Sequence, residues 1–69
     1  MNDVNYNRAV DQLVFYRRMA VLAETGTPTY TAYINKLAAG SIILGIVCDK
    51  DFDEVDFDVC EAYDSKYCR

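Results

Sequence analysis

The chain has 69 residues, a formal net charge of −4 at pH 7 and 52% hydrophobic residues. So short a chain forms a single domain, residues 1–69, and buries a small share of its surface, so we expect extra stability from self-association. The apolar content excludes a disordered chain, and the net acidity opposes direct nucleic-acid binding, because phosphate binding depends on Lys and Arg.

The first predicted helix covers residues 1–23. Val10, Leu13 and Val14 recur at the spacing of one helix face. The segment from Leu13 to Ala23 is apolar on almost every side, interrupted only by Arg17 and Arg18. A helix with apolar residues on more than one side must cover the surplus with a partner or a second copy.

A short turn follows this helix. Gly26 suits the left-handed position after a helix, Thr27 suits an N-cap, and Pro28 suits the first position of a new helix. One helix therefore ends and another begins within a few residues. Such a connection predicts an antiparallel helical hairpin at the N-terminal end of the chain.

The extent of the second helix is open on sequence grounds. Apolar and small residues recur at spacings of four and three from Tyr30 to Cys48, which favours one helix from Pro28 to Cys48. Gly40 and Gly45 count against it, since glycine costs about 1 kcal/mol relative to Ala inside a helix. Alternatively, the helix ends at Gly40 and residues 41–48 form a strand that pairs with residues 55–60.

The C-terminal segment also fits a helix. Phe52, Val55, Val59 and Tyr63 lie on one helical stripe, and Asp53 suits an N-cap. We therefore favour an all-α fold, a small oligomeric three-helix bundle with an N-terminal hairpin. The alternative is an α+β fold of two helices plus a β-hairpin from residues 41–48 and 55–60.

The surplus apolar residues predict an oligomer interface. They come from the first helix and from the uncharged run of residues 38–48. That run is too short to cross a bilayer, which needs about 20 apolar residues, so no membrane association is expected. The predicted interface residues are Leu13, Phe15, Tyr16, Met19, Leu22, Ile42, Ile43 and Ile46.

Eight of the eleven acidic residues lie between residues 49 and 64. Phenylalanine side chains are interspersed among these carboxylates. An aromatic anchor surrounded by charge is typical of a protein-binding surface, because apolar area supplies affinity and charge supplies steering. The predicted partner-binding residues are Asp51, Asp53, Glu54, Asp56, Phe57 and Asp58. The alternatives are that Phe57 belongs to the core and that the charges only keep the chain soluble.

Other sites find little support. Asp49, Asp51 and Asp53 resemble the start of a calcium loop, but glycine and glutamate are missing at its sixth and twelfth positions. The chain has no His, so neither a zinc site nor a base-activated nucleophile is indicated, and no cofactor is predicted. Three cysteines, with no signal-peptide pattern, indicate a reducing, cytoplasmic setting.

The sequence thus predicts a small, non-enzymatic, homodimeric or larger oligomeric protein that binds a basic surface of another protein. Inhibitors or adaptors of the kind encoded by phages and mobile elements have this character. Three alternatives remain: a self-associating structural or regulatory oligomer, a nucleic-acid mimic and a weak divalent-cation binder.

Overall fold

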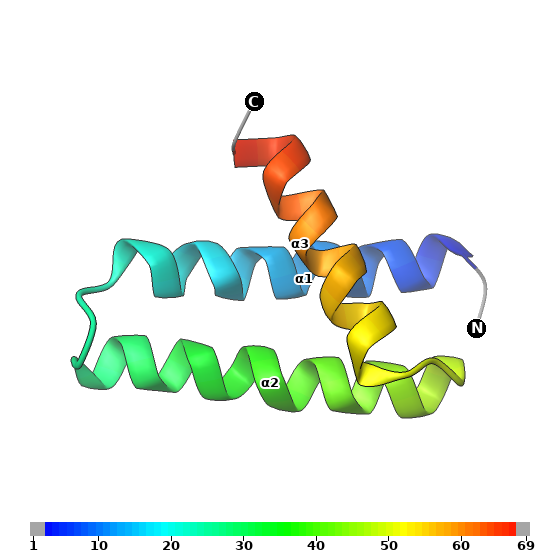
Figure 1. Ribbon diagram of the computed structural model, residues 1–69, viewed down its shortest axis with the longest axis horizontal. Helices are drawn as coiled ribbons and strands as arrows, with labels where there is room; N and C mark the ends of the chain where they lie inside the picture. The colour runs from blue at the N-terminus through cyan, green and yellow to red at the C-terminus, as the bar shows by residue number, and fades with distance from the viewer. Residues whose placement is uncertain (1–2, 68–69) are drawn as a thin grey trace.

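The computed structural model describes residues 3–67 and contains three helices, α1 (Asp3–Leu22), α2 (Pro28–Cys48) and α3 (Phe52–Tyr67) (Figure 1). No strand occurs in this part of the chain, so the all-α prediction is confirmed. The alternative β-hairpin is wrong, because residues 41–48 and 55–60 are helical. The first helix was predicted to start at Met1, which lies outside the described residues. Cys68, one of the three cysteines, also lies outside them.

The turn between α1 and α2 has the predicted local chemistry. Gly26 has a φ of +91°, and Thr27 is the N-cap of α2, where its hydroxyl accepts a hydrogen bond of 3.2 Å from the Tyr30 amide. The same hydroxyl donates to the Glu24 carbonyl at 2.7 Å, which fixes the turn on both sides. As a result α1 and α2 lie side by side and run in opposite directions (Figure 1). We call this pair the α1–α2 hairpin.

The two glycines of α2 permit close packing and do not end the helix. A Cβ atom on Gly40 would lie 2.6 Å from the Leu13 Cδ2 atom, and one on Gly45 would lie 2.7 Å from the Lys50 carbonyl oxygen. Both distances are well below a van der Waals contact. Gly40 and Gly45 therefore suit these positions, because α1 and the chain after α2 approach the α2 backbone too closely to leave room for a side chain.

The link from α2 to α3 is fixed by two capping arrangements. Asp49 is left-handed, with a φ of 55°, and the Lys50 amide donates to the Gly45 carbonyl at 2.8 Å, the pattern that commonly closes a helix. Asp51 is the N-cap of α3: its carbonyl accepts from the Val55 amide, and its amide donates to the Glu54 carboxylate at 3.4 Å. The N-cap predicted at Asp53 is thus two residues too late.

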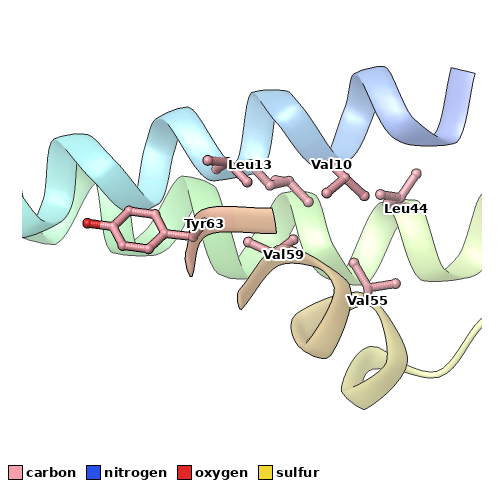
Figure 2. Packing of buried hydrophobic residues seen from close by; sticks show 7 residues of the cluster. Val10, Leu13, Leu44, Val55, Val59 and Tyr63 are labelled. Carbon is pink, nitrogen blue, oxygen red and sulfur yellow. The ribbon is translucent and has the colours of Figure 1, made fainter. Parts of the chain in front are cut away.

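The core forms where α3 crosses the hairpin. Figure 2 shows Val55 and Val59 of α3 pointing toward the hairpin, where Val10, Leu13 and Leu44 lie, while the Tyr63 ring extends along the hairpin away from Val10. Val55 and Val59 are 0% and 1% exposed. Full burial of such a side chain stabilises a fold by about 1.5–3 kcal/mol. This stripe holds α3 across one broad face of the hairpin (Figure 1).

The length of α2 corrects one premise of the sequence analysis. The helix begins at Pro28, so it has 21 residues, and by length and composition it could cross a membrane. The argument that the apolar segment is too short is therefore wrong. The core helix of a soluble protein can satisfy the same criterion but is mostly buried, whereas only 17% of the apolar window in α2 is buried; α2 also carries Lys36 near its middle.

We predict different outcomes for alanine at the two glycines of α2. Gly45→Ala should lower the free energy of unfolding by about 1–3 kcal/mol, because its methyl group meets a backbone carbonyl that cannot move without opening the α2 cap. Gly40→Ala should cost less, because the obstacle is the end of a leucine side chain and helix propensity recovers about 1 kcal/mol. Urea denaturation measures both, and a Gly45→Ala protein as stable as wild type would contradict the close approach.

Candidate functional site

The side of α3 opposite its buried stripe carries exposed carboxylates around one exposed aromatic ring. Phe57 is 64% exposed and lies one helical turn from both Asp53 and Glu61. Its ring therefore takes no part in the core, which answers the alternative left open by the sequence. We define the acidic face of α3 as the exposed residues Asp53, Asp56, Phe57, Glu61 and Asp64.

The six predicted partner-binding residues divide into two groups. Asp53, Asp56 and Phe57 belong to the acidic face. The other three have roles in the fold: Asp51 and Glu54 cap α3, and Asp58 turns toward α1. Sequence reasoning missed Glu61 and Asp64, although the helical spacing from Phe57 was the signal that could have identified them.

A shallow hollow of about 440 Å³ borders the Phe57 ring. Its lining combines one cation with three carboxylates. Lys50 is the cation, and its ammonium group lies 4.7 Å from the centre of the Tyr6 ring. The residues around the hollow are Lys50, Asp53, Glu54, Phe57 and Asp58. A partner side chain could enter this hollow beside an apolar ring and meet mainly negative charge.

Tyr6 and Asp58 connect α1 to α3. The Tyr6 hydroxyl donates a hydrogen bond to the Asp58 carboxylate. Burial raises the pKa of the Tyr6 phenol above its ordinary value, and the hydrogen bond and the negative charge of Asp58 raise it further. Both effects favour the protonated phenol. The bond therefore fixes the rotation of α3 near the middle of the helix and keeps Asp58 off the acidic face.

The arginine pair of α1 contacts tyrosine rings of α3. The Arg17 guanidinium lies 5.3 Å from the centre of the Tyr63 ring, and that of Arg18 lies 4.5 Å from the centre of the Tyr67 ring. Arg18 also donates to the Tyr63 hydroxyl at 3.4 Å. Because arginine is costly to bury without a carboxylate, the sequence favours pairing of these residues with Asp53, Asp56 or Asp58, within one chain or between subunits. Within the chain both arginines make cation–π contacts, which leave the acidic face without neutralisation by Arg17 or Arg18 of the same chain.

The residues of the predicted oligomer interface do not share one surface. Leu13 is only 4% exposed and packs in the core, so it offers little accessible surface to a second copy. Phe15 and Leu22 are exposed on α1, whereas Tyr16 and Met19 are half-buried. On α2 the exposed fractions are 51% for Ile42, 61% for Ile43 and 77% for Ile46. The exposed aliphatic surface is thus concentrated on α2.

A second, wholly apolar hollow of about 310 Å³ lies between α1 and α2. Ala9, Gln12 and Tyr16 border it on α1, and Gly40, Ile43 and Val47 border it on α2. Sequence reasoning missed this hollow, because Gly40 was considered only as a helix breaker. At that position Leu13 of α1 packs against the α2 backbone, and both residues belong to the lining of the hollow.

The described residues do not bring three metal-ligating side chains together. Within residues 5–67, whose side chains the structure describes, no group of three or more Cys, Asp or Glu residues could hold a metal ion. Asp49 and Asp51, which began the calcium-like pattern, cap α2 and α3. No protein-family model matches the chain, and comparisons with curated proteins and solved structures return no significant match.

Removal of the Tyr6 hydroxyl should loosen α3. In Tyr6→Phe the Asp58 carboxylate loses its donor, so we expect the free energy of unfolding to fall by about 0.5–1.5 kcal/mol at neutral pH. Tyr30→Phe is the matched control, because Tyr30 lies in the first turn of α2, at the opposite end of the hairpin. Chemical denaturation followed by circular dichroism measures the difference. Equal stabilities of the two variants would contradict a structural role for the bond.

The same pair predicts a pH dependence. The pKa of Tyr6 is higher in the folded chain than the ordinary value of 10.0. The stability that this protonated phenol contributes is therefore complete below pH 10 and is lost as pH rises further. The stability gap between wild type and Tyr6→Phe should shrink above pH 10. Denaturation of both proteins from pH 8 to 11 tests this, and a constant gap would contradict the raised pKa.

Proposed function

We propose that this chain is a small, non-enzymatic protein-binding module that docks the acidic face of α3 on a basic surface of another protein. The observation that carries the proposal is the position of Phe57, a large ring that is 64% exposed amid carboxylates and is not needed for the core. An exposed ring of this size forgoes the favourable free energy of apolar burial, which a bound partner would supply by covering it.

Charge and shape support the same proposal. Four carboxylates surround Phe57 on one helix face, and a basic partner would be attracted to them at long range. The ring and the neighbouring hollow then supply the short-range contact. Solubility alone would explain the carboxylates but gives no reason for an exposed phenylalanine at their centre.

The size of the module favours stoichiometric action. A single exposed helix face on a chain of 69 residues can block or bridge a partner, whereas nothing in the chain supplies a base-activated nucleophile. We therefore propose a cytoplasmic inhibitor or adaptor, of the kind that phages and mobile elements encode. The acidic face acts through proteins and not through direct contact with nucleic acid, whose phosphates it would repel.

A matched pair of variants tests the proposal. The test variant combines Asp56→Asn, Phe57→Ala and Glu61→Gln, and leaves the capping residues Asp51 and Glu54 intact. The control combines Asp11→Asn, Leu22→Ala and Glu24→Gln. It removes the same charge from the hairpin, and Leu22 is 63% exposed, like Phe57.

Wild type and control should capture the same protein from a host lysate, and the test variant should lose it. With the captured protein purified, its affinity should fall as salt is added, because part of the attraction is between exposed charges. Equal capture by all three proteins, or an affinity that does not change with salt, would contradict the proposal.

A further inference from the structure

The hairpin is covered on one face only. In Figure 1, α3 crosses in front of α1 and α2, and it packs on them through Val55, Val59 and Tyr63. On another side of the hairpin lies the apolar hollow of about 310 Å³, whose lining includes no residue of α3. We call this surface, bordered by Ala9, Gln12, Tyr16, Gly40, Ile43 and Val47, the open hairpin face.

The open hairpin face is more apolar than solubility requires. Ile43 and Val47 are 61% and 55% exposed, and Ile46, which continues the surface around α2, is 77% exposed. The core residues Leu13 and Leu44 form the floor of the hollow. Contiguous aliphatic surface of this kind is characteristic of an interface, whereas single exposed apolar residues are ordinary.

We propose that a second copy of this chain docks on the open hairpin face, hairpin against hairpin, about a two-fold axis. The two hairpins then form a four-helix core, and each α3 lies on the outside. A two-fold contact requires a surface that complements itself, and an apolar face with a shallow hollow beside protruding isoleucines meets this requirement.

The available area agrees with a stable dimer. The molecule measures 35 × 26 × 17 Å, and part of the 26 Å width is α3 extending beyond α1 (Figure 1), so a contact that approaches the ~800 Å² per partner of a standard interface must run along the length of both hairpin helices. The thin 17 Å dimension reflects one helix layer laid across a helix pair. A second hairpin would give the buried side chains of α1 and α2 apolar neighbours on both sides.

The charge distribution permits this association. No carboxylate borders the hollow, and the acidic face lies on α3, which does not contribute to the hollow. Lys36 lies beside its rim, with its ammonium group 5.9 Å from the centre of the Tyr16 ring and 5.2 Å from the centre of the Tyr33 ring. Repulsion between two chains of net charge −4 is therefore weakest along this contact.

Two polar side chains beside the open hairpin face, Gln12 and Lys36, favour a second copy over a lipid bilayer as its partner. A bilayer core would have to accommodate Gln12 and Lys36, which border the apolar surface, whereas a protein interface places such residues on its hydrated rim. In the dimer the two acidic faces stay exposed on separate α3 helices. This last consequence, two partner-binding surfaces on one particle, rests on the proposed function.

Sedimentation velocity over a range of micromolar concentrations tests the inference with three proteins. Wild type should sediment with the mass of two chains. Ile43→Gln/Ile46→Gln should raise the dimer dissociation constant at least about tenfold, the effect of removing apolar contacts from an interface centre. Phe57→Gln is the matched control, since Phe57 is 64% exposed but lies on the acidic face, and it should dimerise like wild type.

Circular dichroism of the double variant confirms that it remains helical, as expected when exposed residues are replaced by a good helix former. Independently of any variant, a mixture of isotope-labelled and unlabelled wild-type chains should give nuclear Overhauser effects between copies at Ile43 or Val47. Three results would overturn the inference: a wild-type monomer at all concentrations, copy-to-copy contacts at α3 only, or a monomer that binds neutral phosphatidylcholine vesicles. The control variant separates this test from the proposed function, because Phe57→Gln should lose the partner and keep the dimer.

Discussion

The packing of Val55, Val59 and Tyr63 against the α1–α2 hairpin determines what the rest of the molecule presents to solvent. Because these three residues lie on one stripe of α3, burying them turns the opposite stripe, with Phe57 and its carboxylates, outward. The same packing occupies one face of the hairpin and leaves another without a covering helix. Both surfaces to which we assign binding therefore follow from one contact, which Tyr6 and Asp58 keep in register.

Helix boundaries could be predicted from the sequence where neighbouring residues fit only one local conformation. Gly26, Thr27 and Pro28 suit only the end of one helix and the beginning of another, and the structure has them in those places. Gly40 and Gly45 could not be interpreted from sequence in this way. Their role depends on two residues outside α2: Leu13 of α1 approaches Gly40, and Lys50, which follows the helix, approaches Gly45. Helix propensity alone therefore indicated a break in α2 that does not occur.

The candidate site was predictable in composition but not in its detail. The cluster of acids and Phe57 is visible in the sequence, yet Asp51, Glu54 and Asp58 proved to be capping and connecting residues. Acidic residues near the start of a helix serve the helix itself, and only the rotation of α3 shows which of them remain available. Tyr16 and Ile43 of the open hairpin face were predicted as interface residues, but their arrangement on one surface was not, because it depends on which side of the hairpin α3 covers.

The rotation of α3 on the hairpin is the claim on which the whole account depends, and solution NMR of side-chain contacts tests it most directly. The account predicts nuclear Overhauser effects from the methyl groups of Val55 and Val59 to those of Val10 and Leu44, and none from the Phe57 ring to the hairpin of its own chain. Contacts between the Phe57 ring and the Val10 or Leu44 methyl groups would contradict it, because α3 would then bury the face to which we assign partner binding.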